Sequence, residues 1–179
     1  KEQWSSYFKR LQSHPAWGTK NIVSWDVNIQ GAREINSTVT ANPEVYYFSF
    51  VNSNTVLDSS SGRHIPNNTM SFIIRSNARL MGMKKAYFED GTSTDSTWFE
   101  NDGIVNKKSM YGPTTGLNGA DPITNYSEDE ILIPGQWYAM NGLKMDHRRM
   151  VGHGAKEKDY KLLMEKYITH LKLIQSLPK

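Results

Sequence analysis

One segment constrains the fold of this chain more than any other. Residues 44–51, EVYYFSFV, are aromatic or β-branched almost throughout and are bounded by Pro43 and Asn52, which predicts a β-strand. The other strand-like segment is short, Trp137 to Asn141. A doubly wound sheet that folds by itself needs more strands than these, although strands and helices alternate as in part of one. We therefore expect a piece of a larger α/β fold.

Residues 4–11, 29–41 and 157–173 carry the three- and four-residue apolar spacing of amphipathic helices. Asn42-Pro43 is expected to stop the second of them. Residues 70–83 favour a helix over a strand. Polar stretches rich in Gly, Pro, Ser or Asn separate these segments and predict loops at 52–69, 84–97, 109–130 and 142–154. There is no repeat and no interior linker, so residues 1–179 are expected to form part of one domain.

The composition indicates a folded globular chain and excludes two classes of partner. Of 179 residues, 37% are hydrophobic, and a net charge of +3 is spread along the sequence. The densest basic run, between Lys144 and His153, is too thin to indicate nucleic-acid binding. No apolar run approaches the ~20 residues that cross a bilayer, so we expect no transmembrane segment.

Three features bear on the compartment. The chain has no Cys, which excludes disulfides, thiolate metal sites and Cys nucleophiles. Its charged start does not resemble a signal peptide, so any signal would lie upstream. Glycosylation sequons begin at Asn36, Asn67 and Asn125, which favours a secreted glycoprotein.

Five histidines could carry chemistry: His14, His64, His147, His153 and His170. His14 precedes a Pro at a helix end and His170 lies on the last helix, so both are expected to be structural or exposed to solvent. His64 lacks an acidic or His neighbour at metal-ligand spacing. His147 is different, because it lies on a loop after a predicted strand, where α/β enzymes display catalytic groups.

Asp102 is the carboxylate that could serve His147. It stands in the stretch WFENDGIVNKKSMYGP, residues 98–113, at what reads as a strand end. A general-base His works when a carboxylate holds its other ring nitrogen. Asn101-Asp102-Gly103 is also an ordinary turn sequence, and the spacing alone leaves both interpretations open.

Four segments together resemble one enzyme family. YFKRLQSHPAW, DVNIQGAREIN, ENDGIVNKKSMYGP and MDHRRMVG are similar to the C-terminal half of the thermoalkalophilic and staphylococcal lipases, which are α/β-hydrolases. The similarity runs from about Tyr7 to the closing helix. It implies that Asp102 is the triad acid and His147 the triad base, in the chain order nucleophile, acid, base. Gly103 would then let the chain turn so that Asp102 points at the His147 loop.

The sequence also departs from that family. No Gly-x-Ser-x-Gly nucleophile elbow is present, and the nearest imitation, residues 91–95, lacks the second Gly. The resemblance implies calcium ligands at two positions that here are Arg149 and Gly154, and a zinc-binding Asp where this chain has Asn21. Because these residues are poor ligands, we expect no metal cofactor.

Three interpretations follow. The first is a C-terminal portion of a lipase-like α/β-hydrolase that needs an N-terminal half to complete the sheet. That half, in a nicked or otherwise separated protein, would supply the nucleophilic Ser, the oxyanion hole and the lid for a lipid or ester substrate. The second is an inactive lipase homologue that serves in binding, storage or defence. The third is a stand-alone α+β module without an active site, although its few strands leave edges that favour aggregation or a partner.

Overall fold

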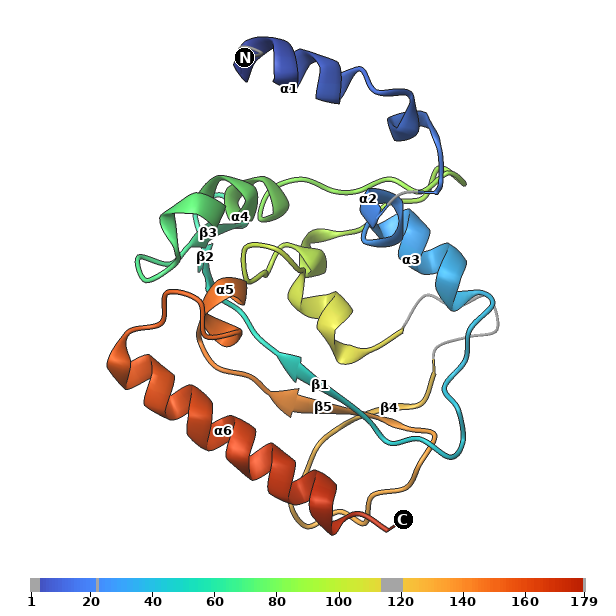
Figure 1. The fold of residues 1–179 in the computed structure, drawn as a ribbon, viewed down its shortest axis with the longest axis vertical. Coiled ribbons are helices and arrows are strands. Elements are labelled where there is room, and N and C mark those ends of the chain that lie inside the picture. Colours follow the sequence, from blue (N-terminus) through green and yellow to red (C-terminus); the bar gives the residue numbers. More distant parts are fainter. Residues whose placement is uncertain (1–3, 22, 114–120, 179) are drawn as a thin grey trace.

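The centre of the fold is a small parallel sheet. The structure is a computed structural model that describes residues 4–21, 23–113 and 121–178. Within them, β1 (Tyr47–Val51), β5 (Trp137–Asn141) and β4 (Ile123–Asn125) form a sheet in the order β1-β5-β4, with both pairs parallel. Figure 1 shows this sheet with the long C-terminal helix α6 (Glu157–Ser176) on one side and the yellow segment that ends at residue 113 on the other.

Aromatic side chains join the two longer strands. β1 and β5 pair in register from Tyr47 with Trp137 to Val51 with Asn141. The Tyr47 and Trp137 rings stack with centroids 4.8 Å apart, and those of Phe48 and Tyr138 with centroids 5.6 Å apart. Such cross-strand pairs stabilise a sheet. The two predicted strands are therefore confirmed, although the first begins at Tyr47.

The predicted helices are present, and the two predicted at 29–41 and 70–83 are shorter than expected. They correspond to α1 (Trp4–Gln12), α3 (Ile29–Asn36), α4 (Arg75–Met81, preceded by the 3-10 turn η2, Phe72–Ile74) and α6. α3 ends before the predicted stop at Asn42-Pro43. The hydroxyls of Ser37 and Thr38 donate to the carbonyls of Glu34 and Ile35 at 2.6 and 3.0 Å, and such local bonds compete with helix continuation.

Two of the predicted loops contain strands. Residues 52–69 include an antiparallel hairpin of β2 (Thr55–Asp58) and β3 (Arg63–Pro66). Its turn is held by Asp58, whose carboxylate accepts from both Ser60 and Ser61. The other strand is β4, only three residues long, in the predicted loop 109–130. Residues 114–120 of that loop lie outside the described part of the chain.

The remaining elements are single turns. They are η1 (Pro15–Gly18), α2 (Val23–Asp26), η3 (Ser96–Trp98), η4 (Lys107–Tyr111) and α5 (His147–Met150). η4 contacts both β1 and β5, on the side of the sheet away from α6 (Figure 1). α5 interrupts the predicted loop 142–154 and begins at a residue of the candidate site.

Apolar packing joins α6 to the sheet and to α5. Leu163 of α6 is 2% exposed and clusters with Met145 and Met150. Phe50 of β1 and Tyr167 of α6 pack against this cluster, and the Tyr167 hydroxyl donates to the Met150 carbonyl at 2.6 Å. The turn α5 is thus packed against α6, the longest of the described helices. None of the helices in the described ranges is long and apolar enough to cross a bilayer.

Candidate active site

Asp102 lies at the tip of a tight turn whose ends are bridged by Asn101 and Asn106. The prediction that it stands at a strand end is wrong, because the residues directly before it form a 3-10 turn (Ser96–Trp98) and a single bridge at Asn101 instead of a strand. Its side chain is 1% exposed. The backbone N–H groups of Ile104 and Val105 donate to Oδ1 at 3.0 and 2.8 Å. These two bonds fix the carboxylate and leave Oδ2 for another donor.

Gly103 makes this turn possible. Its φ is +97°, a conformation that side chains with a Cβ rarely adopt. A Cβ at this position would also lie 2.7 Å from Cδ1 of Ile74. The Gly103 carbonyl accepts from Nδ2 of Asn77 in α4 at 2.6 Å. The expected tight turn at Gly103 is confirmed, and Ile74 packs closely over it.

Asn101 is fully buried and anchors the same turn. Its Nδ2 donates to the carbonyls of Ala78 and Phe99 at 3.1 and 2.9 Å, while Oδ1 accepts from the Gly103 N–H at 2.9 Å. The Asn54 N–H, just beyond β1, donates to the Asn101 carbonyl at 3.1 Å. Asn101 therefore ties the Asp102 turn to α4 and to the carboxyl end of β1. From the sequence, Asn101 is predicted only as a turn residue.

His147 is the first residue of α5, a few residues beyond the carboxyl end of β5. Its backbone N–H donates to the Asp102 carbonyl at 3.0 Å. Its side-chain Nδ1 lies 2.9 Å from Asp102 Oδ2. The structure thus brings together two residues 45 positions apart in the sequence. Backbone and side chain of the pair are both joined, so the geometry is set at two points.

The two members of the pair differ in exposure, and that difference sets what they can do. The His147 side chain is 43% exposed, against 1% for Asp102. An ionised carboxylate beside Nδ1 holds the proton on that nitrogen and leaves Nε2 basic. Nε2 has no hydrogen-bond partner in the described residues. The arrangement can accept a proton from a group brought to the exposed side of the ring.

The other histidines lie elsewhere. His14 caps η1, with Nδ1 accepting from the Ala16 N–H at 3.2 Å. Burial lowers the pKa of His64, which lies 3.4 Å from the Thr55 hydroxyl. The His170 ring packs edge-on against Phe48 and Phe50, and burial lowers its pKa as well. His153 is exposed.

The positions implied for metal ligands hold residues that do not fit a hard cation. Arg149 directs Nε toward the buried Asp146, 3.6 Å from Oδ2, so a positive charge already occupies this place. Gly154 offers no side chain, and Asn21 is exposed. Within the described ranges, no group of three or more His, Asp or Glu side chains could hold a metal.

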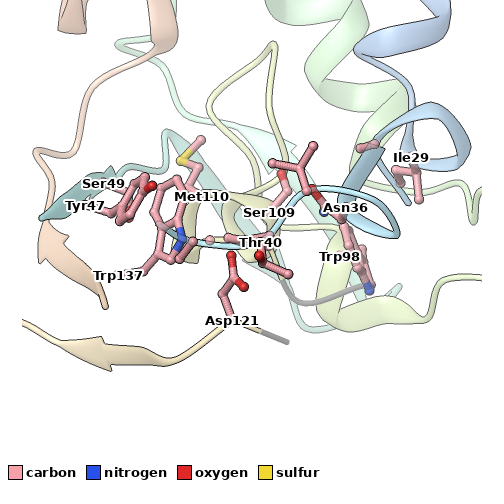
Figure 2. A pocket seen from close by; sticks show the side chains of 15 residues that line it. Ile29, Asn36, Thr40, Tyr47, Ser49, Trp98, Ser109, Met110, Asp121 and Trp137 are labelled. Carbon is pink, nitrogen blue, oxygen red and sulfur yellow. The ribbon is translucent and has the colours of Figure 1, made fainter. Parts of the chain in front are cut away.

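A cavity of about 440 Å³ lies away from the Asp102–His147 pair. Figure 2 shows side chains from α3, η4 and the sheet around it, including Ile29, Met110 and Trp137. Tyr47 and Trp137, which line it, are the first residues of their strands, whereas Asp102 and His147 lie beyond the strands' carboxyl ends. Neither member of the pair lines this cavity. We therefore place the candidate site at the hydrogen-bonded pair and not at the cavity.

A parallel sheet with a joined Asp–His pair at its carboxyl end is consistent with the C-terminal part of an α/β-hydrolase. The family model described as the lipase-like C-terminal domain matches residues 1–163, and the chain belongs to this family. The resemblance seen in the sequence is therefore confirmed.

Relatives and solved structures agree with this assignment. The lipase of Staphylococcus hyicus is 26% identical over 155 residues, 86% of this chain. The structure of EstA from Clostridium botulinum has a TM-score of 0.76 at 32% identity and covers 93% of this chain. Lipase 1 from Pelosinus fermentans has a TM-score of 0.68 at 29% identity and also covers 93%. The crystal structure of the S. hyicus lipase, at 22% identity and a TM-score of 0.69 over 98% of the chain, shows the shared fold.

The chain spans less than half of each of these proteins. It covers 39% of the EstA chain, 44% of each of the two lipase structures and 22% of the full S. hyicus lipase sequence. More than half of each relative therefore lies outside the matched region.

Proposed function

We propose that these 179 residues are the C-terminal portion of one α/β-hydrolase domain that hydrolyses carboxylic esters of the triacylglycerol type. In this proposal His147 is the general base and acid of a catalytic triad, and Asp102 is the carboxylate that orients it. The names of the relatives, which are lipases, support a lipid or ester substrate.

One observation carries the proposal. His147 Nδ1 lies 2.9 Å from Oδ2 of a carboxylate that is 1% exposed, while the ring itself is 43% exposed. A buried carboxylate is costly without partners, and here each oxygen has at least one. An imidazole held in this way keeps one tautomer and presents Nε2 outward, as general-base catalysis requires.

The reaction would proceed in two stages. A Ser hydroxyl attacks the ester carbonyl while His147 Nε2 takes its proton, and backbone donors stabilise the oxyanion. The imidazolium, stabilised by Asp102, then protonates the departing alcohol. Water attacks the acyl-enzyme in the same manner and releases the acid.

The nucleophile, the oxyanion hole and the lid come from residues outside this sequence, in our proposal. No Gly-x-Ser-x-Gly occurs here, and no described Ser hydroxyl bonds His147. The sheet supports the same view, because β1 pairs only with β5 among the described strands. Its five half-buried residues, YFSFV, form an edge that a further strand would cover. An N-terminal half would add that strand.

Secretion and glycosylation are part of the proposal. Of the three sequon asparagines, Asn125 is exposed. Asn67 is partly buried, and its Oδ1 accepts from the Thr69 N–H and hydroxyl at 3.0 and 3.1 Å. A mass loss on enzymatic deglycosylation that disappears in Asn125→Gln would support use of this site, and an unmodified native protein would contradict it.

The decisive experiment uses the native protein that contains this chain. Intact mass under denaturing conditions shows whether the enzyme is one polypeptide or two. Hydrolysis of p-nitrophenyl esters is then compared between wild type, His147→Ala and the matched control His153→Ala, which removes an exposed His six positions along. We expect activity to fall by about 10³-fold or more in His147→Ala and to stay within about twofold in the control.

Other outcomes would contradict the proposal. A folded wild-type protein with no esterase activity on any chain length would favour the inactive homologue, and the search would turn to binding partners. A stable, soluble monomer of residues 1–179 in sedimentation would contradict the need for an N-terminal half.

A further inference from the structure

We propose that Asp146 is a positioning residue for His147 and that Arg149 assists it. The inference rests on the proposed function, because it concerns the same site. No hydrogen bond or ion pair in the described part of the chain joins either side chain to the imidazole. Their role is to hold the first turn of α5 where His147 Nδ1 meets Asp102.

Asp146 is a fully buried carboxylate that the proposed reaction does not use. Its Oδ2 accepts from the Ser71 N–H at 2.8 Å, and Oδ1 accepts from the Arg149 N–H at 3.2 Å. The second bond makes Asp146 the N-cap of α5. N-cap side chains satisfy backbone donors that a helix start would otherwise leave unpaired. α5 is a single turn with little stability of its own, so its start depends on this bond.

The bond to Ser71 connects the two halves of the site. Ser71 precedes η2, and Ile74 at the end of η2 lies over Gly103 in the Asp102 turn. The Arg148 guanidinium also donates to the Ser71 hydroxyl, at 3.4 Å. The His147 turn and the Asp102 turn are therefore both placed against η2. A shift of Asp146 relative to Ser71 would move His147 relative to Asp102.

Arg149 compensates the buried charge. Its Nε lies 3.6 Å from Asp146 Oδ2, and its side chain is 16% exposed. A buried carboxylate without a cation is strongly disfavoured. The guanidinium therefore offsets the negative charge of a carboxylate that accepts from two backbone N–H groups. Its removal is expected to weaken the cap without removing a capping atom.

Substitution of the carboxylate by an amide provides the sharpest test. In Asp146→Asn the volume is kept, but one of the two oxygens becomes an NH₂ group that faces an N–H donor. One backbone donor is then left unsatisfied. Asp95→Asn is the matched control, since Asp95 caps the 3-10 turn η3 by accepting from Thr97 but is exposed. Arg149→Gln and Arg149→Lys separate the charge from the packing.

We expect kcat of the complete enzyme to fall about 10- to 100-fold in Asp146→Asn, because small misplacement of a catalytic group costs that much. KM should stay within about twofold, since substrate binding is untouched. The acidic limb of the kcat–pH profile should shift, since the His147–Asp102 bond is weakened. In Arg149→Gln, kcat should fall by a smaller factor than in Asp146→Asn. Arg149→Lys should restore most of the kcat lost in Arg149→Gln, and kcat of Asp95→Asn should equal that of wild type.

A second readout does not depend on activity. The proton between His147 Nδ1 and Asp102 gives a downfield NMR resonance in selectively labelled enzyme, and it should broaden or move in Asp146→Asn but not in Asp95→Asn. If wild type hydrolyses no ester, the proposed function fails, but this resonance still shows whether Asp146 positions His147. If Asp146→Asn does not fold, the same measurements are made on Arg149→Gln and Arg149→Lys. An unchanged resonance, kcat and pH profile in the folded variants would overturn the proposal.

Discussion

Two regions of this structure are stabilised by different forces. At the carboxyl ends of the strands, three buried polar side chains, Asn101, Asp102 and Asp146, bond to segments distant in the sequence. Along α6, attachment to the sheet rests on apolar residues such as Leu163 and Tyr167. Hydrogen bonds are directional, whereas apolar burial is nearly indifferent to small displacements. We therefore expect the polar side chains to determine the geometry of the site and the apolar face of α6 to determine stability.

Asp102→Asn should separate the geometry of the site from the stability of the fold most strongly. The amide keeps the shape of the turn but disfavours the productive His147 tautomer, so kcat should fall by about 10⁴-fold, with the unfolding transition nearly unchanged. Ester hydrolysis and urea unfolding of the complete enzyme measure both. Asp58→Asn, at the β2–β3 turn, is the control. Loss of less than about tenfold would show that Asp102 does not orient the base.

Leu163→Ala tests the apolar packing of α6. Removal of a buried Leu side chain typically costs about 2–5 kcal/mol, and Leu163 is 2% exposed. The free energy of unfolding should fall by that amount while kcat of the folded enzyme stays within about threefold. Leu171→Ala, on the same helix but 57% exposed, should cost less than about 1 kcal/mol. A large loss of kcat in Leu163→Ala would mean that the apolar face also determines the site geometry.

Gly103→Ala should change both stability and kcat. The new methyl group must adopt a φ of +97° and meets Ile74, so we expect about 1–3 kcal/mol of destabilisation and a clear loss of kcat. Gly91→Ala is the control, because Gly91 has a φ of +81° with open space around it. It should show the backbone cost alone, about 1–2 kcal/mol, with kcat retained. Equal kcat in both variants would show that the Ile74 contact is not needed for the site.

His170 provides the smallest expected effect. Burial lowers its pKa, and nearby Lys166 adds to this. Since the folded protein disfavours the charged ring, stability is retained above the ordinary His pKa of about 6.5 and is lost as the pH falls through it toward the lowered value. Urea unfolding between pH 5 and 7.5 should show a shallower decline in His170→Leu than in wild type. Parallel curves would place the decline on other groups, such as His64.

The sequence predicted the long elements better than the short ones. The strands at residues 44–51 and 137–141 and the closing helix are recognisable because each repeats one period over several residues. The β2–β3 hairpin and α5 were missed because they are short and depend on individual side-chain bonds, those of Asp58 and Asp146. Asp102 was placed at a strand end, but its carboxylate is positioned by a turn that Asn101 and Gly103 hold.

The sequence by itself determined the family, the candidate residues Asp102 and His147, and the absence of a nucleophile motif from this chain, because these are written in local runs of residues. Only the tertiary structure decided that the two side chains meet at 2.9 Å and that Asp146 and Asn101 are buried around them. The physical reason is sequence separation. Contacts between residues 45 to 75 positions apart arise from the packing of whole elements. The local sequence pattern therefore does not predict them.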